Sequence, residues 1–138
     1  MEQSLHLRLH VEEQAVFAAL EQCEAAAAGW GLGAAELGML RLALEELLLN
    51  VCHHSGLGPD AHMDVWLRRD VAALQLRVED PGPSFDPFAR EAPDLERPPE
   101  EREIGGLGIH FVKQTSSRCG WRRAAGRNVV EVAWDLPG

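Results

Sequence analysis

The sequence lacks three features that would quickly assign it to a class. Its three cysteines, Cys23, Cys52 and Cys119, form no CxxC spacing, so neither a disulfide framework nor a zinc ribbon is expected. Its apolar runs are interrupted well short of the roughly 18 residues that a membrane span needs. Positive charge is scarce, because 13 basic residues face 22 acidic ones and leave a net charge of −9. This balance excludes a general binder of nucleic-acid backbones, and we expect a cytoplasmic protein with no membrane segment.

What the sequence does contain is typical of a globular chain. It has 138 residues, 46% of them hydrophobic and 25% charged, which suits one domain over residues 1–138 with its own core.

Apolar periodicity predicts most of the secondary structure. Alternating residues indicate a strand over 5–11 and two more near 63–67 and 74–78. Helix-forming composition and three- to four-residue steps indicate helices over 12–28 and 34–54.

The second half of the chain contains a long interruption in this pattern. Residues 81–103 are rich in proline and charge and are expected to form one long loop, a length that in compact domains is typical of a functional lid. A short helix over 109–116 and two strands near 121–124 and 129–134 are expected to follow, joined by a turn at 125–128. Strands linked mostly by hairpins favour an α+β fold over a doubly wound one.

The helix over 34–54 carries the first candidate site residues. Glu46 and Asn50 are four residues apart and share one face of a helix that is apolar nearly all round. A buried carboxylate and amide need partners, because each is costly when unpaired. The two residues either touch solvent at the edge of the helix or face a ligand cavity.

Asp80 is the second candidate. It continues the apolar face of Leu74, Leu76 and Val78, so the period of two places it on the core side at the strand end. There it either caps the turn Pro81-Gly82 or accepts hydrogen bonds from a ligand.

The third candidate is the glycine cluster over 105–108, which precedes a helix. Glycines let backbone approach a phosphate, and N–H groups at a helix start bind anions, although such clusters are often plain turns. Neither a P-loop nor a Rossmann motif is present.

Together these segments resemble the GHKL ATPase superfamily. Residues 41–54 (RLALEELLLNVCHH) resemble its N box, residues 78–87 (VEDPGPSFDP) its first glycine box and residues 105–113 (GGLGIHFVK) its second. Residues 126–130 (GRNVV) resemble its last hairpin. The nearest resemblance is to the stand-alone anti-sigma-factor serine/threonine kinases. It implies a two-layer Bergerat sandwich, with helices on one face of a mixed sheet and a lid over about residues 88–103.

The resemblance also implies roles for individual residues. Asn50 matches the Mg²⁺ ligand of an ATP site, and Glu46 matches the acid proposed as general base. Asp80 matches the acceptor of the adenine amino group, and Gly82 lets the chain pass close to the base. The backbone that would cradle the phosphates belongs to Gly105, Gly106, Leu107 and Gly108.

The implied function is an ATP- and Mg²⁺-dependent protein kinase. It would phosphorylate a STAS-type antagonist protein, bind a sigma factor and form a homodimer. Ser84 stands where the family usually has the second glycine of its first box, which motivates an alternative, a partner-sequestering module without kinase activity. A sensor histidine kinase fragment is a weaker option, because no helix pair with a phosphoacceptor histidine precedes the boxes.

Three further groups have simpler interpretations. His53 and His54 are adjacent, so they point to different helix faces and make a poor zinc site. Arginines at positions 118, 122, 123 and 127 indicate a solvated surface more than a phosphate or partner site. Lys113 is expected to be an exposed helix lysine, with reach to a phosphate as the alternative, and the four tryptophans are expected in the core or at a dimer contact.

Overall fold

The computed structural model describes residues 2–89 and 107–137. Eight elements follow in the order β1 (Gln3–His10), α1 (Glu13–Gly29), α2 (Ala34–His54), β2 (His62–Arg69), β3 (Ala73–Asp80), α3 (Leu107–Thr115), β4 (Arg118–Ala124) and β5 (Arg127–Asp135). This is the predicted order, and α2 has the predicted bounds. Most of the proposed lid over 88–103 and the glycines Gly105 and Gly106 lie outside the described residues.

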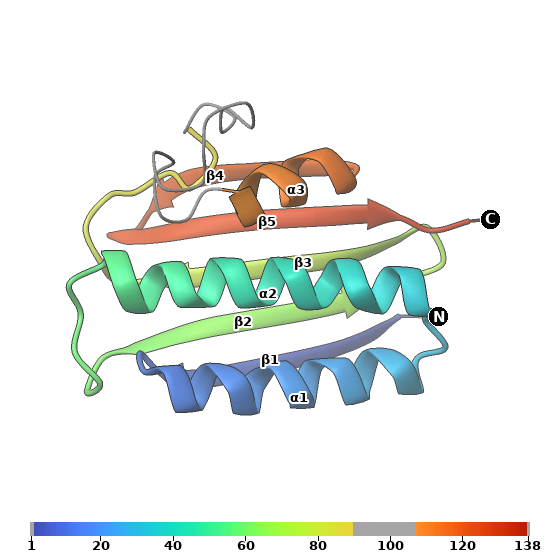
Figure 1. The fold of residues 1–138 in the computed structure, drawn as a ribbon, viewed down its shortest axis with the longest axis horizontal. Helices are drawn as coiled ribbons and strands as arrows, with labels where there is room; N and C mark the ends of the chain where they lie inside the picture. Colours follow the sequence, from blue (N-terminus) through green and yellow to red (C-terminus); the bar gives the residue numbers. More distant parts are fainter. Residues whose placement is uncertain (1, 90–106, 138) are drawn as a thin grey trace, which may run out of the picture.

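The described residues form two layers, a five-stranded sheet and three helices lying on one side of it (Figure 1). The strand order is β1-β2-β3-β5-β4. Apolar residues alternate along the strands, and the face that carries them is the one that the helices cover. On β3 these residues are Leu74, Leu76 and Val78, which are at most 2% exposed. The α+β two-layer class is therefore confirmed.

The expectation of a mixed sheet is wrong, because all four pairings in the described chain are antiparallel. The hairpin of α1 and α2 brings the chain back to the end of the sheet that it left, so β2 runs back along β1 and His10 pairs with His62. β3 and β4 both run antiparallel to β5, so they share a direction, but β5 lies between them.

Turns end the elements where the sequence supplies glycine. Gly56, after α2, has a φ of +75°, a value that residues with a side chain rarely adopt. Ala125 and Gly126, both with positive φ, make a two-residue hairpin, so β5 begins at Arg127, two residues earlier than predicted.

The core lies between the layers. Leu40, Leu44 and Leu48 of α2 are fully buried against the sheet, together with Met63 and Leu67 of β2. No helix in the described residues combines the length and apolar character required to span a bilayer.

We predict that Leu44→Ala lowers the free energy of unfolding by about 2–5 kcal/mol, because it removes buried methyl groups and leaves a cavity. Val71 is 76% exposed, and Val71→Ala is expected to change stability by less than about 0.5 kcal/mol. Urea denaturation measures both, and equal losses for the two variants would contradict the assigned core.

Candidate functional site

Asn50 and Asp80 lie on one small cavity. Asn50 comes from α2 and Asp80 from the end of β3, and the cavity has a volume of about 30 Å³. Apolar side chains of α2, β3 and β5 line much of it, namely Leu47, Val51, Val78 and Val130, and Ser55, Phe85 and Pro87 complete the lining. The predicted placement of Asp80 on the core side is confirmed, since the residue is only 6% exposed.

The Asp80 carboxylate is held on one side only. Its Oδ1 accepts hydrogen bonds from the Gly82 backbone N–H at 2.8 Å and from Asn128 Nδ2 at 3.2 Å. The residues that the structure describes give no hydrogen bond to Oδ2. One oxygen therefore caps the Pro81-Gly82 turn, as the first of the two interpretations expects, and the role of Asp80 toward a ligand stays a prediction.

Asn128 is the residue that sequence reasoning missed. Its Nδ2 also donates to the Pro83 carbonyl at 2.8 Å, and its Oδ1 accepts from the Phe85 N–H and the Trp121 Nε1–H, each at 3.0 Å. Asn128 is 3% exposed and continues the core face of Val130, Val132 and Trp134. The sequence does contain a signal for Asn128: it is a polar residue at the end of a row of alternating apolar residues. Asp80 ends the row on the neighbouring strand in the same way.

Gly82 packs closely against Asp80 and Ser55. A Cβ there would lie 2.8 Å from Asp80 Oδ1 and 3.0 Å from the Ser55 Cβ. Arg123, expected on a solvated surface, is exposed as predicted, and its Nη1 also donates to the Gly82 carbonyl at 2.7 Å. Gly82 is therefore bonded on both sides, through its N–H to Asp80 and through its carbonyl to Arg123 of β4.

Glu46 lies against the start of α3. A Cβ built on Gly108 would overlap the Glu46 carboxyl group, so only glycine permits this approach of α2 and α3. Burial, and secondarily the charge of Glu45, raise the pKa of the Glu46 carboxyl. Leu107 begins α3 and is 36% exposed. Of the predicted site residues, Glu46 thus packs against Gly108, whereas Asn50 and Asp80 line the same cavity.

Phe85 is one of the residues that line the cavity. It is the only exposed residue among those lining it, at 39%, and its ring stacks on His54 with centroids 5.9 Å apart. His54 therefore lies at the cavity edge. About 30 Å³ does not admit an organic ring, whereas ligand pockets usually measure about 300–1,000 Å³. Asn128 holds the Phe85 backbone through the bond to its N–H, so Phe85 can yield space to a ligand only through its side chain.

The remaining candidates lie outside this cavity. Lys113 is exposed, and its Nζ donates to the Phe88 carbonyl at 3.1 Å. Trp134 is in the core, whereas Trp66 lies on the sheet face that the described helices leave uncovered, stacked on His6 and beneath Arg77.

Comparison with known proteins agrees with this arrangement. A family model described as the histidine kinase-like ATPase domain matches residues 9–134. The chain belongs to this family. The match confirms the resemblance to the GHKL ATPases and the Bergerat type of sandwich.

Among solved structures, the histidine kinase-like ATPase domain described here is similar to the RsbU and RsbW domains of Rv1364c from Mycobacterium tuberculosis. The TM-score is 0.64 and the identity 14%, over 99% of this chain and 34% of that one, so the chain spans about a third of its neighbour and the likeness concerns the fold. No curated protein matches the sequence.

We predict that Glu46→Gln is more stable than the wild type at pH 7 and equally stable near pH 3. The folded state holds the Glu46 proton more tightly than the unfolded chain, so ionising Glu46 costs stability as the pH rises above about 4. Below that pH the carboxyl is protonated in both states and the cost disappears. Urea denaturation at the two pH values measures the difference.

The exposed Glu21 of α1 supplies the control, since Glu21→Gln removes one charge from the same acidic chain. A gain for Glu46→Gln no larger than that for Glu21→Gln at pH 7 would contradict the raised pKa that partial burial gives the Glu46 carboxyl.

Proposed function

We propose that this domain binds ATP with Mg²⁺ and transfers the γ-phosphoryl group to a serine or threonine of a STAS-type antagonist protein. In the same proposal it binds a sigma factor, so that phosphorylation of the antagonist controls which partner it holds. The observation that carries the proposal is the convergence of Asp80 and Asn50 on one cavity, with Glu46 one helical turn from Asn50.

The donor set suits the two ligands. Asp80, held through Oδ1, keeps a second oxygen to accept from an adenine amino group, and the apolar walls suit the faces of a purine. Asn50 brings a neutral amide oxygen, a hard ligand of the type that Mg²⁺ accepts. The start of α3 at Leu107 and Gly108 offers backbone N–H groups to phosphate, and we assign the same role to Gly105 and Gly106.

Glu46 is proposed to receive the proton of the attacking hydroxyl. Its raised pKa makes it a better base than an exposed glutamate, because base strength rises with pKa. When bound, Mg²⁺ neutralises charge developing on the phosphates, so the protein's own task is to position the hydroxyl and the nucleotide. The RsbW domain of the structural neighbour supports assignment to the anti-sigma kinase branch.

The small cavity and Ser84 favour a second candidate, a domain that sequesters a partner without phosphoryl transfer. Isothermal titration with Mg-ADP, followed by incubation of labelled ATP with purified STAS-domain proteins, separates the two. Nucleotide binding with label on a STAS serine or threonine supports the kinase, and binding without transfer supports the sequestering domain.

Asp80→Asn is predicted to raise the Kd for Mg-ADP at least about tenfold, because it replaces a carboxylate oxygen beside the base with a weaker acceptor or a donor. Calorimetry measures the change. Asp86→Asn, in the same loop but outside the cavity lining, is the control and is expected to bind like the wild type. Unchanged affinity in Asp80→Asn would remove Asp80 from base recognition.

Glu46→Gln is predicted to bind Mg-ADP within about threefold of the wild type but to lose about 10²–10⁴-fold in transfer rate, the usual contribution of a general base. The amide keeps the volume that packs on Gly108. Single-turnover phosphorylation of the STAS substrate measures the rate, and a wild-type rate would exclude Glu46 as the base.

A further inference from the structure

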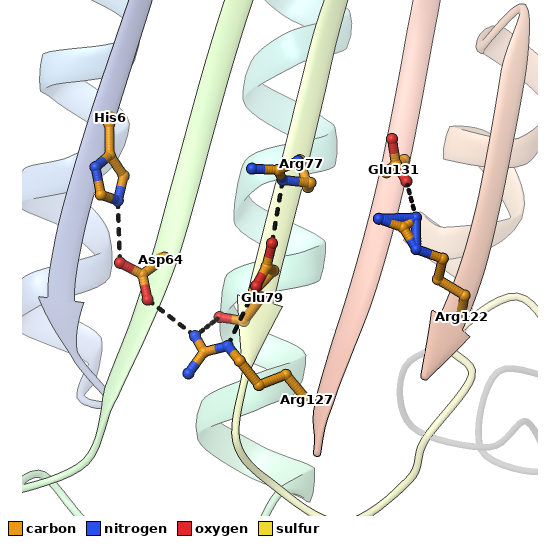
Figure 2. A network of polar contacts seen from close by, with 7 residues as sticks. All are labelled: His6, Asp64, Arg77, Glu79, Arg122, Arg127 and Glu131. Carbon is orange, nitrogen blue, oxygen red and sulfur yellow. Dashed lines mark hydrogen bonds and ion pairs between the residues drawn. The ribbon is translucent and has the colours of Figure 1, made fainter. Parts of the chain in front are cut away.

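Arg127 joins three strands on the face of the sheet that the described helices leave uncovered (Figure 2). From the first position of β5, its Nη2 donates to Asp64 Oδ2 of β2 at 2.9 Å and its Nε to Glu79 Oε1 of β3 at 3.2 Å. Nη2 also reaches the Glu79 backbone carbonyl at 3.3 Å. His6 extends the network to β1 through Asp64, and Arg77 extends it along β3 through Glu79.

These ion pairs are shielded from solvent. The side chains of Asp64 and Glu79 are 13% and 18% exposed, and that of Arg127 is 29% exposed. Charges this well covered are screened less than exposed ones, and removing one partner leaves the other poorly solvated. The network therefore constrains the strands more strongly than an ordinary surface pair.

The network lies directly behind the cavity. Successive strand residues point to opposite faces, so Glu79 and Arg127 occupy the open face while their neighbours Asp80 and Asn128 face the helices. Asp80 and Asn128 are partners in the last described pair of the β3–β5 ladder. The last pairs of a strand ladder open easily unless other contacts stabilise them. Here the bonds from Arg127 to Glu79 connect the residues next to Asn128 and Asp80, and so stabilise this last pair.

We propose that Arg127 is a positioning residue for nucleotide recognition, because it clamps the ends of β2, β3 and β5 and thereby keeps Asp80 bonded to Asn128. This role rests on the proposed function, in which Asp80 receives the base. Arginine suits this role, because its rigid, planar guanidinium can donate to acceptors on two strands at once. The ammonium group of a lysine lacks this planar arrangement of donors.

A matched control lies on the same face. Arg122 donates to Glu131 at 2.8 Å, as close a pair as any that Arg127 makes, but it joins only β4 and β5 and both side chains are 54% exposed (Figure 2). Exposed pairs of this kind contribute little. Arg122→Gln removes the same charge without touching β2 or β3.

The first test compares Mg-ADP affinity by calorimetry in full-length variants. We expect Arg127→Gln to raise the Kd about tenfold, within the range of couplings carried by such networks, and Arg122→Gln to stay within about twofold. Arg127→Lys should recover part of the loss. Urea denaturation establishes that each variant is folded at the assay temperature, so a role in stability alone would leave the Kd unchanged and would overturn the proposal.

The second test needs no nucleotide. Hydrogen exchange of the Trp121 indole N–H, followed by NMR, reports directly on its bond to Asn128. Arg127→Gln is expected to speed this exchange at least about tenfold and Arg122→Gln to leave it unchanged. Unchanged exchange in Arg127→Gln overturns the clamp. Faster exchange in a protein whose wild type ignores Mg-ADP supports the clamp and instead refutes the proposed function.

Discussion

A buried carboxylate at the end of a strand is the constraint on which the rest of the site depends. Asp80 sits where β3 leaves the core, and an unpaired charge there would cost several kcal/mol, of order 3–5 when a buried partner is missing. Among the described residues, two donors meet this cost, and both bond the same Asp80 oxygen: the Gly82 N–H and the Asn128 amide. The helix-facing rows of apolar residues on β3 and β5 therefore both end in a polar residue, Asp80 and Asn128. Together these two residues place polar groups beside a largely apolar cavity.

Two glycines then allow neighbouring segments to pack closely around Asp80 and Asn128. Gly82 lets the chain turn beneath Asp80, and Gly108 lets α3 rest on the Glu46 carboxyl. Because a methyl group at either position would collide with a side chain of the site, these glycines are defined by packing. The site is thus assembled from contacts between elements far apart in the sequence, and its geometry follows from how tightly α2, α3 and the end of β3 meet.

Local patterns were sufficient to predict much of this. Period-two alternation placed Asp80 on the core face, and three- to four-residue spacing predicted α2 with the bounds that it has. The direction of strand pairing was not predictable in this way, because it depends on β5 inserting between β3 and β4. Asn128 was also missed: its importance comes from four hydrogen bonds to segments that are 7 to 48 residues away in the sequence. The functions proposed for individual residues came from the resemblance to the GHKL ATPases. Periodicity predicted only where those residues lie on the helices and strands.

A crystal structure of the domain with Mg-ADP would show whether Asp80 receives the base. We expect the exocyclic amino group of the base to lie about 3 Å from Asp80 Oδ2, the usual hydrogen-bond distance. The Phe85 ring is expected to turn away from His54, and the Asn50 side chain to face the metal ion. A nucleotide bound elsewhere on the molecule, or with its base remote from Asp80, would contradict it.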